Sequence, residues 1–127
     1  GGAIQKMPDG NGKEQKASNK AERIAMGKQV YAQSCFACHQ ADGSGINGTF
    51  PPLAKSDWLN KDVNRSIKAV LEGLSGEIEV NGKKYNSIMP AQVLNDEDAA
   101  NVLTYIYNNW GNNGTEVTPE MVKAQRK

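Results

Sequence analysis

Both cysteines of the chain and its only histidine lie within five consecutive positions, Cys35-Phe36-Ala37-Cys38-His39. These residue types bind metals and form covalent bonds, so their crowding at one place constrains the fold more than any other feature of the sequence. Cysteines three positions apart occur in structural zinc sites, redox dithiols, disulfides and covalent cofactor anchors. A complete interpretation must also give the adjacent histidine a role.

Three of these interpretations account for the motif poorly. A structural zinc site needs four ligands, usually supplied as two pairs, and the chain has no further Cys or His. A thioredoxin-like dithiol follows a strand, whereas a helix is predicted before Cys35. A disulfide, or a pair of buried thiols, leaves His39 without a role.

The remaining interpretation is covalent attachment of a haem, which uses the spacing C-x-x-C-H. At a helix end, residues i and i+3 face the same side, so both thiols can reach one edge of the porphyrin. The residue after the second cysteine then lies beneath the ring centre, where the His39 imidazole can bind iron. Cys35 and Cys38 are therefore predicted attachment points, and His39 the predicted proximal ligand.

The remaining sequence predicts a small, mainly helical domain with long loops. A helix is expected over residues 20–34, because Ile24, Gly27, Tyr31 and Cys35 form one stripe of a 3.6-residue period. A second helix is predicted with Asn60 as N-cap and Gly73 as C-cap, followed by a hairpin over 77–85 that turns at Asn81-Gly82. A third helix is predicted with Asn95 as N-cap, and its buried face is expected to contain Ala99, Val102, Leu103, Ile106 and Trp110. A short last helix is predicted to begin at Thr118-Pro119. The apolar residues of these helices are too few to close a core around themselves, which favours a bound group in the middle.

Composition narrows the functional classes. The 127 residues suit one domain, and a formal net charge of +1 gives no electrostatic signature of a nucleic-acid partner. Residues 1–18 are predicted to be a flexible tail or linker, with the folded domain over 19–127. No apolar stretch reaches the ~20 residues that a membrane span needs. The first twenty residues contain no hydrophobic signal-peptide segment, so a secretion signal is expected to have been removed or to lie outside this chain.

The positions before the motif indicate a family. Gly27 stands eight residues before Cys35, and Tyr31 stands four before it. Over about residues 19–110 the chain resembles a monohaem cytochrome c of the class I type, in which a glycine and an aromatic residue at these offsets mark the crossing of the first and last helices. The resemblance implies an all-α fold of three to four helices around one covalently bound haem c, with Val102 and Tyr105 as the crossing partners.

The second axial ligand follows from the same resemblance. Met89 stands fifty residues after His39 and just before the last long helix, and Pro90 follows it, as in the Met-Pro pattern of the family's distal ligand. Met7 lies in the predicted tail, Met26 lies off the buried stripe of the first helix, and Met121 lies in the short last helix. Pro90 also restricts Met89 to an extended conformation, which helps to aim the side chain. A soft thioether raises the reduction potential of haem iron. The alternative is that Met89 is a flexible filler of the core.

The loop of residues 48–54 contains two prolines that resemble the family's Pro-x-Leu segment. There, a proline carbonyl accepts the second N–H of the proximal imidazole and fixes the ring. Spacing to Leu53 favours Pro51 for this role, with Pro52 as the alternative. The predicted apolar walls of the haem pocket are Leu53, Leu71, Leu74, Ile88 and Val93, and Trp58 or Tyr85 is a candidate to bind a haem propionate.

With both axial positions filled by protein, the expected function is one-electron transfer rather than catalysis. The expected partners are redox proteins of a periplasmic respiratory or denitrification-type chain: an oxidase, a nitrite reductase, a dehydrogenase or a cytochrome complex. Residues 80–112 resemble haem domains fused to or partnered with periplasmic oxidoreductases such as copper nitrite reductase, so a free carrier and a domain of a larger enzyme both remain open. The rival functions are an enzyme or gas sensor with an open iron site, and a non-haem thiol or metal module.

Overall fold

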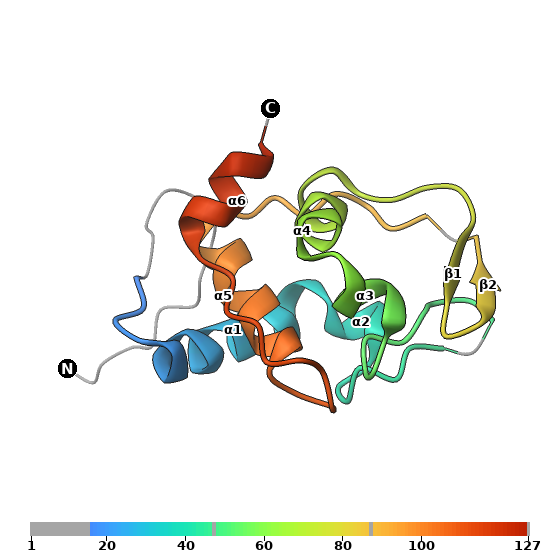
Figure 1. Ribbon diagram of the computed structural model, residues 1–127, viewed down its shortest axis with the longest axis horizontal. Helices are drawn as coiled ribbons and strands as arrows, with labels where there is room; N and C mark the ends of the chain where they lie inside the picture. Colours follow the sequence, from blue (N-terminus) through green and yellow to red (C-terminus); the bar gives the residue numbers. More distant parts are fainter. Residues whose placement is uncertain (1–15, 47, 87, 127) are drawn as a thin grey trace.

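A computed structural model describes residues 16–46, 48–86 and 88–126 of the chain. Its helices and strands follow one another as α1 (Lys20–Ser34), α2 (Phe36–His39), α3 (Asp57–Lys61), α4 (Val63–Glu72), β1 (Ile78–Val80), β2 (Lys83–Tyr85), α5 (Asp96–Tyr107) and α6 (Pro119–Gln125). Helices α1, α5 and α6 gather at one end of the molecule, and the β1–β2 hairpin lies at the other (Figure 1). The all-α fold with one small hairpin is therefore confirmed.

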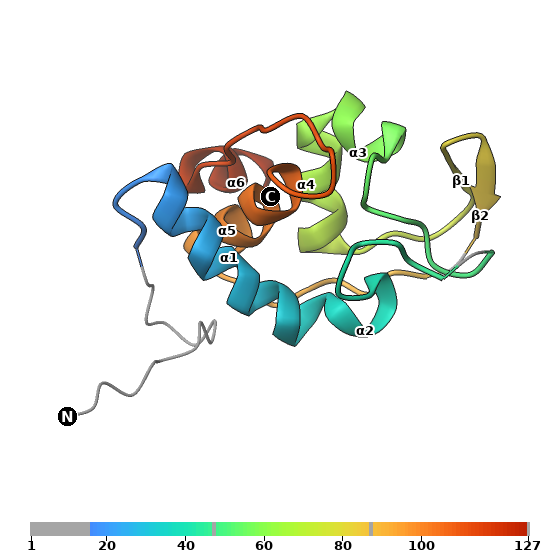
Figure 2. The ribbon, with the colours of Figure 1, turned by 90° about the horizontal axis from the view of Figure 1, so that it is seen from below.

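The crossing of α1 and α5 is a contact of backbone against backbone, visible as two adjacent ribbons in both views (Figure 2). A Cβ added at Gly27 would lie 1.9 Å from the carbonyl oxygen of Asn101 and 2.8 Å from Cβ of Tyr105. The predicted partner Tyr105 is confirmed, but Val102 is not the nearest partner. Helix α5 presents Asn101 to the glycine, and Val102 is fully buried in the core cluster.

A buried ion network reinforces the same crossing, and the sequence analysis did not identify it. Arg23 is only 8% exposed. Its Nη1 donates to Glu97 Oε2 at 2.9 Å and to Asn101 Oδ1 at 2.7 Å, and its Nε donates to Glu116 Oε2 at 3.2 Å. The backbone N–H of Ala17, within the predicted tail, also donates to Glu97 at 3.1 Å. Residues 1–15 of that tail lie outside the described residues.

The predicted start of the second helix is wrong, because two short helices replace the single one expected. Asn60 lies inside α3, which is capped by the Ser56 hydroxyl. The extended backbone of Asp62 (φ −149°, ψ 98°) then interrupts the helix, and its carboxylate caps α4 by accepting the N–H of Arg65 at 3.1 Å. The Asn60 side chain instead donates to Asn112 Oδ1 at 3.0 Å, joining α3 to the loop after α5.

The remaining local predictions agree with the structure, except at Trp110. Asn81 and Gly82 supply the positive φ angles of the hairpin turn, Asn95 caps α5, and Thr118 caps α6. Trp110 lies beyond the end of α5 at φ 57°, so it is not on the helix face. Its ring packs beside Tyr31, with centroids 5.3 Å apart, and is partly exposed.

In the described parts of the chain, no helix combines the length and apolar character needed to span a bilayer.

The Gly27 contact predicts that Gly27→Ala destabilises the protein. Alanine favours helix over glycine by about 1 kcal/mol, so helix propensity alone predicts stabilisation. The added methyl would meet Asn101, and overpacking of this kind costs about 1–3 kcal/mol. Denaturant unfolding of the haem-loaded protein measures the sign of the change. Ala25→Gly, at an exposed position of α1, calibrates the propensity contribution, and a higher free energy of unfolding for Gly27→Ala would contradict the close contact.

Candidate functional site

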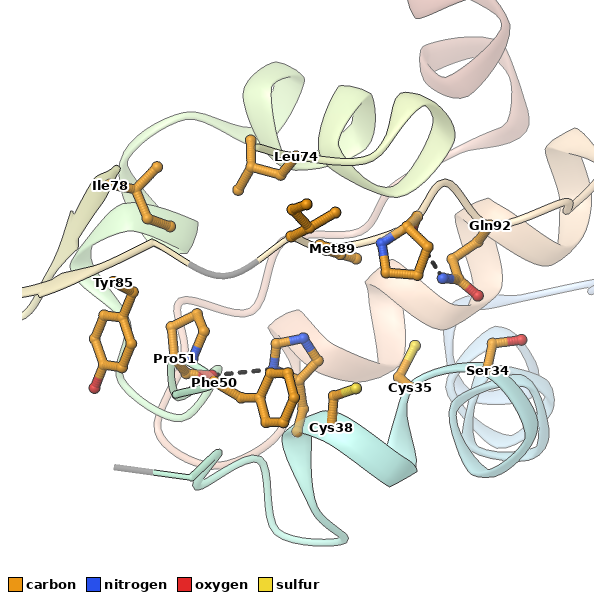
Figure 3. Close-up of a pocket in the computed structure, with 13 residues that line it drawn as sticks. Ser34, Cys35, Cys38, Phe50, Pro51, Leu74, Ile78, Tyr85, Met89 and Gln92 are labelled. Atoms are coloured by element: carbon orange, nitrogen blue, oxygen red, sulfur yellow. Dashed lines mark hydrogen bonds between the residues drawn. The ribbon is translucent and has the colours of Figure 1, made fainter. Parts of the chain in front are cut away.

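The Cys-x-x-Cys-His motif forms a single turn of helix directly after α1. Cys35 ends α1 with φ −120° and donates its N–H to the Tyr31 carbonyl at 2.9 Å. Helix α2 then carries Cys38 and His39, and Gln40 ends it with φ 70°. One helical turn thus brings both thiols and the imidazole to the same hollow (Figure 3).

Two adjoining hollows occupy the space between this turn, α4, the hairpin and the segment around Met89. They enclose about 680 Å³ and about 590 Å³ of space free of atoms, part of it open to solvent. Both are lined by Cys35, His39, Pro51, Leu74, Ile78 and Met89. Apolar walls, two thiols, an imidazole and a thioether are a donor set and surroundings that suit a covalently attached haem.

His39 is held in one orientation by the loop before α3. Its Nδ1 lies 3.0 Å from the carbonyl oxygen of Pro51, and the residue is 8% exposed. Pro51, and not the alternative Pro52, therefore contacts the ring. Burial lowers the pKa of His39, which favours the neutral imidazole that metal binding needs. With Nδ1 engaged by the carbonyl, Nε2 is the nitrogen left for a metal.

Met89 lies on the opposite side of the hollow from the two cysteines (Figure 3). Its backbone pairs with Leu74, since each residue's N–H donates to the other's carbonyl at 2.8 Å. Of the methionines that the structure describes, Met26 and Met121 line neither hollow, and the Met121 sulfur accepts the N–H of Thr118 at 3.5 Å. Met7 is outside the described residues.

The thiols have properties that disfavour the non-haem alternatives. Burial, with a smaller contribution from Cys38, raises the pKa of the Cys35 thiol to about 12. A redox-active dithiol instead requires a lowered pKa, because the thiolate is the reacting species. Within residues 16–46, 48–86 and 88–126, no group of three or more Cys, His, Asp or Glu is arranged to hold a metal ion.

The predicted apolar walls are correct in part. Leu53, Leu74 and Ile88 line the hollows. Leu71 packs against the helical core instead, and the prediction for Val93 is wrong, because its side chain is 90% exposed. Alternate residues of an extended segment face opposite sides, and in this segment Gln92 is the one that faces the hollow.

The hairpin contributes a wall that the sequence analysis did not name. Ile78 lines both hollows, and Val80 lines the second. The alternation of Ile78 and Val80 in a strand was the signal that could have identified them. Both candidates for a propionate contact also border the space: Tyr85 lines the first hollow, and Trp58 lines the second with the Arg65 guanidinium 4.1 Å from its ring centroid. Their role toward a propionate stays a prediction.

A small helical fold with a Cys-x-x-Cys-His turn facing a methionine across an apolar hollow defines a class I cytochrome c. The sequence profile of the cytochrome c family matches residues 24–110, and the chain belongs to this family. It is 39% identical over 126 residues to cytochrome c-552 of Thermus thermophilus, covering 81% of this chain and 95% of that protein. Two relatives are longer than this chain. The CcoP subunit of the cbb3-type cytochrome c oxidase from Rubrivivax gelatinosus is 32% identical over 105 residues, which cover 82% of this chain and 32% of that subunit. The cytochrome c subunit of a quinone alcohol dehydrogenase from Gluconobacter oxydans strain 621H is 32% identical over 98 residues, which cover 75% of this chain and 20% of that subunit.

Membership of this family establishes the cofactor and the general role. The protein carries a covalently bound haem c, and Cys35 and Cys38 have the spacing of its attachment motif. Its general role is that of an electron carrier.

Replacing the cysteines tests the attachment directly. Cys35→Ala and Cys38→Ala should each leave one covalent bond, so that haem stays with the chain through acidic acetone extraction. The double variant should release its haem into the acetone phase. Ser34→Ala, which alters another residue of the first hollow, is the matched control and should retain haem. Covalent haem in the double variant would show that another residue forms the bond.

Proposed function

We propose that this domain is a one-electron carrier whose haem c is attached through Cys35 and Cys38 and ligated by His39 and Met89. The observation that supports this most strongly is the convergence of these four side chains on one apolar hollow from two distant segments. The haem iron supplies the one-electron couple. The chain supplies the ligands, their orientation and the exclusion of water.

Each ligand residue is held by a contact that suits its role. The Pro51 carbonyl 3.0 Å from His39 Nδ1 fixes the plane of the imidazole and raises its basicity as a ligand. The Met89 thioether, a soft ligand, favours ferrous iron and raises the reduction potential. With His39 and Met89 both bound to the iron, O₂ and peroxide would have no open site. This favours electron transfer over the rival function of an enzyme or a gas sensor.

The partners that we propose are redox proteins of a periplasmic respiratory or denitrification-type chain. Support comes from relatives named as subunits of a quinone alcohol dehydrogenase, a gluconate 2-dehydrogenase and cbb3-type oxidases. The match to nearly the whole of cytochrome c-552 supports a free carrier, and the matches to parts of longer subunits support a domain of a larger enzyme. The complete open reading frame separates these two, because a catalytic domain in the same frame would identify a fusion.

Met89→Ala tests the distal ligand. The variant should lose the sulfur-to-iron charge-transfer band of the ferric protein, and its ferrous form should bind CO. Its reduction potential should fall by about 0.1 V, within the range of roughly 0.8 V that axial ligands span. Optical spectra and a redox titration measure all three.

Met121→Ala is the matched control, since Met121 lies in α6 and lines neither hollow. It should leave the band, the potential and the CO response unchanged. A high-spin ferric spectrum in the unmodified protein would contradict the proposal and favour an enzyme or sensor. An unchanged spectrum in Met89→Ala would require a different sixth ligand.

A further inference from the structure

The end of α4 has a backbone conformation that only glycine readily adopts. Gly73 is the C-cap of this helix, with φ 81° and ψ 179°, and its N–H donates to the Ala69 carbonyl at 2.9 Å. Residues with a side chain are strained in this region. Helix capping alone would explain the glycine, but the space around it shows a second requirement.

The missing side chain of Gly73 leaves the space in which the Met89 segment lies. A Cβ built at this position would be 2.7 Å from the Met89 carbonyl oxygen, 2.8 Å from the Ala91 nitrogen and 3.2 Å from the Pro90 carbonyl carbon. All three are backbone atoms, so no side-chain rotation can relieve the contact. A substitution at Gly73 must therefore move the main chain that carries Met89.

Backbone hydrogen bonds hold the two segments together at this point. Leu74 and Met89 exchange two bonds of 2.8 Å, and the Gln92 N–H donates to the Val70 carbonyl at 2.8 Å. Leu74 and Met89 accordingly lie on the same side of the hollow, across from Cys35 and Cys38 (Figure 3). The methionine segment thus has its main-chain position set by the last turn of α4 and the two residues after it.

Helix α4 is itself firmly packed, so it can serve as a fixed support. Ile67 is fully buried. Ser66 Oγ lies 3.1 Å from the Tyr107 hydroxyl, which donates to the Leu59 carbonyl at 2.6 Å. These contacts join α4 to α5 and α3. Densely packed interiors deform little, so a displacement at Gly73 is expected to pass to the methionine segment rather than into the helix.

We infer that Gly73 is a positioning residue for the distal ligand, which sets how firmly the Met89 sulfur is held at the iron. The inference rests on the proposed ligation by Met89 and adds the structural element that controls it. A ligand held on a close backbone contact resists displacement, because the segment cannot swing away without breaking the Leu74 and Gln92 bonds.

The test is displacement of Met89 by added imidazole in the ferric, haem-loaded protein. Gly73→Ala should lower the apparent dissociation constant for imidazole by about tenfold and weaken the sulfur-to-iron band. Gly76→Ala is the control, because Gly76 also has a positive φ of 90° but has no atom within 4 Å of the position that a Cβ would occupy. It should bind imidazole as the unmodified protein does. Equal imidazole affinities for the two variants would overturn the inference.

A second measurement needs no substitution and remains informative if Gly73→Ala does not fold. After correction for intrinsic rates, the amide of Met89 should exchange with deuterium no more than about tenfold faster than that of Val70 in α4, since both belong to one cooperative unit. Faster exchange than this would show that the segment opens independently of α4 and would overturn the inference. If the unmodified protein lacks the sulfur-to-iron band, it is the proposed ligation by Met89 that fails.

Discussion

The contact of Gly27 with the backbone of Asn101 is the constraint on which the rest of the structure depends. It brings α1 and α5 closer than side chains would allow, and the buried Arg23 network with Glu97 keeps them in register. The end of α1 then has a fixed position, and the turn of α2 that follows it carries both thiols and the imidazole. The positions of the two thiols and the imidazole therefore depend on a helix crossing that does not itself line the hollow.

The opposite side of the hollow is built by different means. It contains little regular structure: a two-stranded hairpin and the segment that carries Met89. Backbone hydrogen bonds to α4 and a glycine at its end take the place of helix packing there. This division would suit the proposed ligation by His39 and Met89, because ligands held on both sides would change little in geometry when the charge on the iron changes.

Local signals in the sequence predicted most of the elements and the central residues of the site. Caps such as Asn95 and Thr118, the turn at Asn81-Gly82 and the periodicity of α1 depend on residues within a few positions, so a single segment contains the necessary information. The errors arose where distant segments decide. The Asn60 side chain bonds to the loop after α5 and does not start a helix, and Val93 faces solvent while Gln92 lines the hollow. The nearest neighbour of Gly27, Asn101, was also not identified from the sequence.

The sequence by itself determined the cofactor and the class of protein, because five adjacent residues contain the complete attachment motif and the proposed proximal ligand, His39. It also singled out Met89 and Pro51, through patterns shared with the family. Only the tertiary structure decided how these residues are held. The Pro51 carbonyl lies against His39, the hairpin forms one wall of the hollow, and the backbone of the Met89 segment lies close to Gly73. The physical reason is that spacing along a chain fixes which groups lie on one helical turn, whereas approach between segments fifty residues apart depends on the packing of every element between them.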